Sequence, residues 1–176
     1  MHIIYRLYLE TEPGMSLFRD MYQKYAGDVY RFAYWLCGDQ FAAEDITSET
    51  FVRAWGNLDP SRMETVRAYL FRIARNIYLQ GRRRDDRITQ LPENRVAPTR
   101  NPAAVVADRL QLEQISTYLQ TLPEIDRSAF LLRVVYELPY AEVARVLRIS
   151  LSAAKVKVYR VRLKMAMFND KVQENA

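Results

Sequence analysis

The sequence predicts an all-α protein: two small helical domains joined by a flexible linker, the C-terminal one a helix-turn-helix. Apolar residues recur every three to four positions along most of the 176 residues, which is the period of amphipathic helices. Between about residues 84 and 101 this period is lost, and Pro92, Pro98 and a run of charges follow, as in a linker. Few stretches alternate with period two, so strands are not expected.

In the N-terminal half, three helices are expected after an N-terminal extension, residues 1–14. The first begins at the N-cap Ser16 and stops at Gly38. The second runs from about Gln40 to Asn57, and the third from about Thr65 to Arg83. They form a predicted domain at residues 15–84.

In the C-terminal half, a linker at residues 85–101 leads into a domain at residues 102–170 and a tail at 171–176. Asn101 and Pro102 are typical of a helix start, and that helix is expected to end near Thr121. A helix from Glu124 and another from Pro139 follow. The turn from Arg148 to Ser150 then precedes the last helix, which Ser150 caps.

The composition excludes several classes of protein. The chain is 49% apolar and 27% charged, which is typical of a globular protein. A single cysteine, Cys37, and a single histidine, His2, exclude a disulfide framework and a zinc site of the usual kind, and they fit a reducing cytoplasm. Cys37 lies in an apolar run and is expected in the core. The opening HIIYRLYL is too short for a signal peptide, and no window is long and apolar enough to span a membrane.

Charge is unevenly distributed along this chain of net charge +5 and pI near 9.4. The segment Arg148–Met167 carries six basic residues and no acid, and it follows a helix and a short turn. This arrangement is typical of a helix that reads the major groove of DNA. A basic, merely solvated amphipathic helix is the alternative. Its inward stripe is predicted to comprise Val156, Tyr159, Leu163 and Met167.

Two other segments stand out by charge. Arg67–Arg84 carries six arginines, interleaved aromatics and no acid, which suits a single strand whose bases stack on rings. The alternative is that Tyr69 and Phe71 are core and the arginines a solvated face. The segment AAEDITSETFVRAW carries carboxylates but has no histidine, metal-ligand set or glycine-rich loop nearby. A protein-docking face is therefore expected there rather than a catalytic site.

These segments occur in the order and spacing of one known family. Its motifs here are AAEDITSETFVRAW, RAYLFRIARN and LPEIDRSAFLLRVVYELPYAEVARVLRIS. From about Leu17 to Phe168 the chain resembles the extracytoplasmic-function (ECF) sigma factors of bacterial RNA polymerase. The resemblance implies a sigma-two domain, a sigma-four domain and no catalytic activity, cofactor or metal. It implies binding to core RNA polymerase, recognition of the −35 element and opening of the −10 element of promoter DNA.

The resemblance also implies contact residues. The second helix would dock on core polymerase, the loop Asn57–Glu64 and the third helix would hold the −10 strand, and the last helix would read −35 DNA. The core-polymerase positions are Glu44, Asp45, Glu49, Val52 and Arg53; the −10 positions are Arg67, Arg72, Arg75 and Asn76; the −35 positions are Ser152, Ala153, Lys155, Val156, Lys157 and Arg160.

The chain departs from the family pattern at two places. The family usually reads GTVKSR where residues 152–157 read SAAKVK. Because lysine cannot make the bidentate contact of arginine to guanine, a shifted −35 preference, or one based more on shape and phosphates, is expected. Arg148 stands where the family often has glycine. A left-handed backbone there would cost about 1–2 kcal/mol, and a different turn geometry is the alternative.

The predicted linker fits two separate DNA contacts. Fully extended, residues 85–101 reach about 60 Å, or about 17 base pairs. A linker of this length would also let a partner protein hold the two domains together in an inactive form. The resemblance implies an anti-sigma factor as that partner, often at the membrane, with the chain itself in the cytoplasm.

Two other functions remain open from the residues alone. A conventional helix-turn-helix regulator would bind duplex DNA without polymerase, and it would not need the acidic segment. A nuclease or other DNA-modifying enzyme would need metal carboxylates or a nucleophile–base pair beside the basic surfaces, and none is apparent in the sequence.

Overall fold

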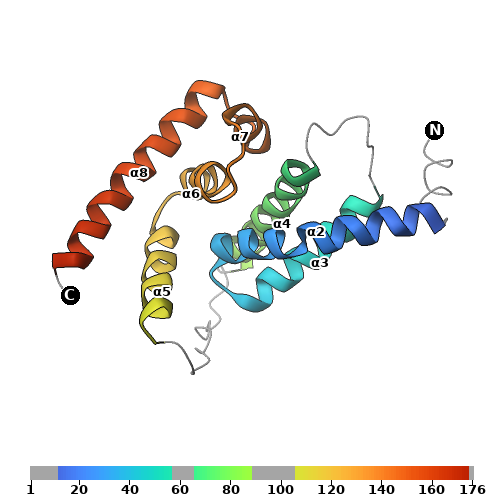
Figure 1. Ribbon diagram of the computed structural model, residues 1–176, viewed down its shortest axis with the longest axis horizontal. Coiled ribbons are helices and arrows are strands. Elements are labelled where there is room, and N and C mark those ends of the chain that lie inside the picture. The colour runs from blue at the N-terminus through green and yellow to red at the C-terminus, as the bar shows by residue number, and fades with distance from the viewer. Residues whose placement is uncertain (1–11, 57–65, 89–105, 175–176) are drawn as a thin grey trace. The chain divides into compact units, whose positions relative to one another are not determined.

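Every element in the computed structural model is helical across the residues that it describes, 12–56, 66–88 and 106–174 (Figure 1). The chain divides into two compact units, Met1–Val106 and Ala107–Ala176. The prediction of an all-α fold with two helical domains is confirmed. The loop Asn57–Glu64 and most of the predicted linker lie outside the described residues.

The first unit is a three-helix bundle of α2 (Glu12–Cys37), α3 (Gln40–Gly56) and α4 (Val66–Ile88), in which each helix packs on the other two (Figure 1). Its fully buried apolar residues come from all three helices, as the helical period of the sequence predicts. They include Val29, Phe32, Leu36, Ala43, Phe51, Ala54, Leu70, Phe71 and Ala74.

A sharp turn orients α3 against α2. Gly38 has a φ of 72°, a left-handed conformation that glycine adopts without strain, and it ends α2 as predicted. Asp39 then caps α3, because its Oδ1 accepts a hydrogen bond of 2.7 Å from the backbone N–H of Ala42. Cys37 is half-buried at this turn, and its thiol donates to the carbonyl of Asp39 at 3.2 Å.

Both outer helices of this unit are longer than predicted. Helix α2 begins at Glu12, inside the expected N-terminal extension, and Pro13 suits a first turn because its missing N–H is not needed there. Helix α4 continues to Ile88, so residues 85–88 of the expected linker are helical. No proline or glycine occurs between Arg84 and Ile88, so nothing in the chain stops the helix at Arg83.

The second unit contains α5 (Val106–Thr121), α6 (Glu124–Phe130), the π-helical segment η2 (Leu131–Val135), α7 (Tyr140–Leu147) and α8 (Leu151–Glu174). Helix α8 packs on α6 and α7 (Figure 1). The buried Arg127 of α6 joins the end of α5, donating to the carbonyl of Leu119 at 3.2 Å and to Oε1 of Gln120 at 2.7 Å.

The helix expected from Glu124 is not uniform. Its second half widens into η2, where the N–H of Tyr136 donates to the carbonyl of Leu131 at 3.0 Å. Glu137 then adopts a φ of 57° before Pro139 starts α7. The wider turn changes the helical phase, and Val134 is exposed.

The turn between α7 and α8 has the left-handed geometry considered for Arg148, with φ 57° and ψ 47°. The N–H groups of Arg148 and Ile149 donate to the carbonyls of Arg145 and Ala144 at 3.3 and 3.0 Å, which closes the end of α7 as a Schellman motif. The predicted cap of α8 is also present. Ser150 Oγ accepts a hydrogen bond of 3.1 Å from the N–H of Ala153.

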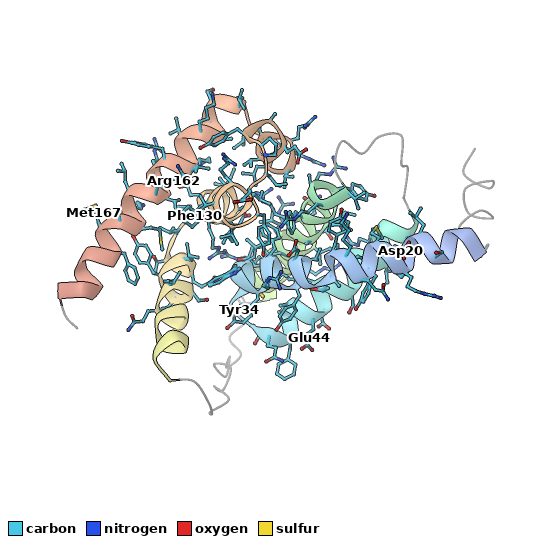
Figure 2. The ribbon with its side chains drawn as sticks, in the orientation of Figure 1. Asp20, Tyr34, Glu44, Phe130, Arg162 and Met167 are labelled. Atoms are coloured by element: carbon cyan, nitrogen blue, oxygen red, sulfur yellow. The ribbon has the colours of Figure 1, made fainter. Side chains whose placement is uncertain are left out.

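The predicted inward stripe of the last helix is wrong. The exposed fractions of Val156, Tyr159, Leu163 and Met167 are 46%, 62%, 49% and 64%. The residues that α8 buries include Ala154, Val158 and Val161, which are smaller than Tyr159, Leu163 and Met167. Small side chains allow α8 to lie close to α6 and α7, whereas the prediction assigned the larger apolar residues to the core. Figure 2 shows Met167 on the side of α8 away from α6.

Candidate nucleic-acid and protein-binding surfaces

Helix α3 presents an outward face that mixes carboxylates with apolar side chains. Val52 and Phe41 are 65% and 75% exposed, which is unusual for large apolar residues on one helix. At about 100° per residue, Phe41, Asp45, Ser48 and Val52 fall on one line along the helix. Glu44 is exposed beside this line. We call Phe41, Glu44, Asp45, Ser48 and Val52 the docking face.

The other two predicted polymerase contacts on α3 are engaged within the unit. Arg53 Nε pairs with Oε1 of Glu49 at 2.7 Å, one helical turn away. A second nitrogen of Arg53 donates to Oε1 of Gln80 on α4 at 3.1 Å. Glu49 and Arg53 therefore border the docking face and connect it to α4.

Helix α4 divides the four predicted −10 positions into two pairs. Arg67 pairs with Asp28 of α2 at 2.8 Å and lies 5.7 Å from the ring centroid of Phe71, so it faces the bundle. Arg75 is only 8% exposed. Arg72 is exposed and Asn76 is half-buried.

The outward side of α4 brings a ring together with cations. The guanidinium of Arg72 lies 5.3 Å from the ring centroid of Tyr69. Burial raises the pKa of Tyr69 above 10.0, although the neighbouring Arg72 opposes the shift, so its hydroxyl stays protonated at neutral pH. At about 100° per residue, Tyr69, Arg72, Asn76 and Arg83 share one side of the helix. We call these four residues the strand face.

Helix α8 exposes four of the six predicted −35 positions, Ser152, Lys155, Val156 and Arg160, while Ala153 is half-buried. Lys157 differs from them. Its Nζ makes an ion pair of 2.7 Å with Oδ1 of Asp126 on α6, and both side chains are largely buried. Lys157 therefore faces the body of the unit rather than solvent.

Two family models match the chain, Sigma-70 region 2 over residues 21–88 and Sigma-70 region 4 over residues 112–165. The ECF RNA polymerase sigma factor SigM of Bacillus subtilis is 28% identical over 158 residues, covering 88% of this chain and 97% of SigM. SigE of Mycolicibacterium smegmatis is 32% identical over 156 residues, covering 86% of this chain and 61% of SigE.

The chain belongs to the ECF sigma factors.

Solved structures agree with the sigma-factor fold. The sigma factor RpoE of Bartonella quintana, in a complex with the anti-sigma factor NepR, superposes with a TM-score of 0.70 at 23% identity, covering 87% of this chain and 96% of RpoE. CnrH, in complex with the cytosolic domain of CnrY, superposes with a TM-score of 0.67 at 22% identity, covering 97% of each chain.

The three surfaces of this sigma factor lie inside the matched regions, except for the C-terminal end of α8. The docking face and the strand face fall within region 2, and the exposed residues of α8 up to Lys164 fall within region 4. Two exposed residues on these surfaces, Phe41 and Tyr159, were not predicted as contacts. Tyr69 is one of the rings that the sequence predicted for base stacking. Helical spacing from Asp45 and Val156, applied to the outward side of each helix, identifies Phe41 and Tyr159.

Among the residues that the structure describes, no group of histidine, cysteine and carboxylate side chains is placed to hold a metal ion. Within the same residues, no helix is both long enough and apolar enough to cross a membrane.

Proposed function

We propose that this sigma factor binds core RNA polymerase through the docking face of α3 and directs it to promoters. The observation that carries the proposal is the exposure of Phe41 and Val52 among the carboxylates of the same helix face. Large apolar residues exposed among charges on one helix face are typical of a protein interface. A regulator that only binds duplex DNA has no use for such a face.

The two basic surfaces supply the DNA contacts in this proposal. The strand face of α4 would hold the −10 strand once the duplex opens, because Tyr69 offers a ring for stacking and Arg72 and Arg83 offer phosphate contacts. The exposed side of α8 would read the −35 duplex in the major groove. The protein would act in the cytoplasm as a specificity subunit, with no catalytic step of its own.

Control by an anti-sigma factor is part of the proposal. Two of the similar folds were solved in complexes, one with an anti-sigma factor and one with the cytosolic domain of CnrY. The docking face is a natural target for such a partner, because a protein that covers Phe41 and Val52 would exclude core polymerase.

A binding measurement with purified core RNA polymerase tests the docking face. The double variant Asp45→Lys/Val52→Glu should bind core polymerase at least about tenfold more weakly, since it reverses one charge of the docking face and puts a carboxylate in place of an exposed apolar side chain. Asp20→Lys is the matched control, because Asp20 is an exposed carboxylate on α2, away from this face (Figure 2). Equal affinity of the double variant and the control would refute the docking face.

A further inference from the structure

The exposed side of α8 has an apolar line at its centre. Ser152, Val156, Tyr159, Leu163 and Met167 lie within about 80° of one another around the helix, at about 100° per residue. This line is opposite Ala154, Val158 and Val161, which are buried against the rest of the unit. We call the exposed line the reading ridge. Its apolar members are thus held away from the core by the packing of α8.

Cations flank the reading ridge on both sides. The same spacing of about 100° per residue places Lys155 and Arg162 along one edge of the ridge, and Arg160 and Lys164 along the other. All four side chains are exposed. No acidic residue occurs between Leu151 and Phe168. A helix with two cationic edges complements a groove between two phosphate backbones, so duplex DNA is the occupant that this surface fits.

The rotation of α8 is fixed by contacts outside the ridge. The ion pair of Lys157 with Asp126 holds one side of the helix against α6. The cap from Ser150 to the N–H of Ala153 fixes where the helix begins. Val156 therefore lies on the outward side in the second turn, within the N-terminal part of the helix that meets base edges in a helix-turn-helix.

The chemistry of base edges limits what an apolar side chain can recognise. In the major groove, guanine, adenine and cytosine present hydrogen-bonding atoms, whereas thymine also presents a 5-methyl group. Valine has no side-chain group that can hydrogen-bond to those base atoms, but it can bury the methyl group of thymine. Lys155 and Arg160, at the edges of the ridge, are placed for phosphates.

We infer that Val156, extended by Tyr159 in the next turn, reads thymine 5-methyl groups in the −35 element. The inference rests on the proposed function and adds the base chemistry that α8 selects. Lys157 is a positioning residue in this account: it orients the ridge and makes no base contact.

The test begins with core polymerase carrying the full-length chain. This holoenzyme selects −35 duplexes from a library randomised only at that element, and each thymine of the selected element is then replaced singly by deoxyuridine. That replacement removes only the methyl group. At one or two positions the affinity should fall about fourfold, the effect of one buried carbon.

Variants assign the effect to the ridge. Val156→Ser should remove the difference in affinity between the thymine and deoxyuridine duplexes, because serine has no methyl group to pack against the methyl group of thymine. Val156→Thr is the matched control and should keep much of the difference, since threonine retains one methyl group. Tyr159→Ala should reduce the effect at the neighbouring position.

The possible outcomes distinguish failure of methyl reading from failure of the proposed function. If deoxyuridine has no effect at any position, or if Val156→Ser preserves the difference, methyl reading is refuted while promoter selection stands. If Val156→Ser and Tyr159→Ala leave DNA selection unchanged but abolish core binding, the ridge is a protein-docking surface and the inference fails. If the chain neither binds core polymerase nor selects any duplex with it, both are overturned.

Discussion

At the residue scale, neighbouring basic residues of the sequence have different roles in the structure. Lys155 and Lys157 are two positions apart, yet Lys155 is exposed and Lys157 pairs with Asp126 at 2.7 Å. Arg72 and Arg75 differ in the same way: Arg72 is exposed, whereas Arg75 is buried, with an exposed fraction of 8%. The family resemblance implied all four as DNA contacts. The packing of each helix determines which of them can reach DNA.

The pair of Lys157 and Asp126 yields a stability prediction. Asp126→Asn leaves a largely buried ammonium group without its carboxylate, which should lower the free energy of unfolding by about 1–3 kcal/mol. Urea unfolding measures the change, and the charge swap Asp126→Lys/Lys157→Asp should recover part of it. Lys155→Met is the control: stability should change by less than about 0.5 kcal/mol, while affinity for the −35 duplex falls. Unchanged stability of Asp126→Asn would contradict the positioning role.

The two arginines of α4 yield a second prediction. Arg72→Ala should impair promoter opening with little effect on stability, because its side chain is exposed beside Tyr69. Arg75→Ala should chiefly lower the free energy of unfolding of the bundle, by about 1–3 kcal/mol. It removes a buried side chain together with the contacts which that side chain makes. Permanganate footprinting of the −10 region measures opening, and urea unfolding measures stability. Normal opening with Arg72→Ala would count against the strand face.

At the element scale, the α7–α8 turn holds a non-glycine residue in a left-handed conformation. Arg148→Gly should raise the free energy of unfolding by about 1 kcal/mol, because glycine adopts this conformation without the clash of a Cβ atom. Arg148→Ala is the matched control, since it removes the same side chain but keeps the Cβ atom. Urea unfolding should separate the two variants. Equal stability of both would show that the backbone strain is negligible.

Sequence reasoning predicted the helices well and their faces less well. Ser150, Gly38 and the period of apolar residues identified where elements begin, end and repeat, because capping and amphipathicity are local properties. The inward side of α8 was assigned wrongly, because the sequence contains two candidate stripes. The tertiary contact with α6 and α7 selects the one with smaller side chains. The π-helical widening at Leu131–Val135 had no local signal at all.

At the scale of the whole molecule, the two units carry different parts of the proposed function. The first unit carries the docking face and the strand face on adjacent helices, joined by the contact of Arg53 with Gln80. The second unit carries the reading ridge. Each surface lies on helices packed within its own unit, so each unit can present its surface independently. The order of the motifs along the chain, through the family resemblance, predicts the same division.

The central claim is that the chain supplies promoter specificity to core RNA polymerase. Mapping of transcript 5′ ends on a promoter library, with core polymerase in the presence and absence of the protein, tests it most directly. The account predicts a defined set of start sites that appear only with the protein. They should be lost with Asp45→Lys/Val52→Glu and retained with Asp20→Lys. If the protein binds duplex DNA alone and adds no start sites to core polymerase, the account is contradicted.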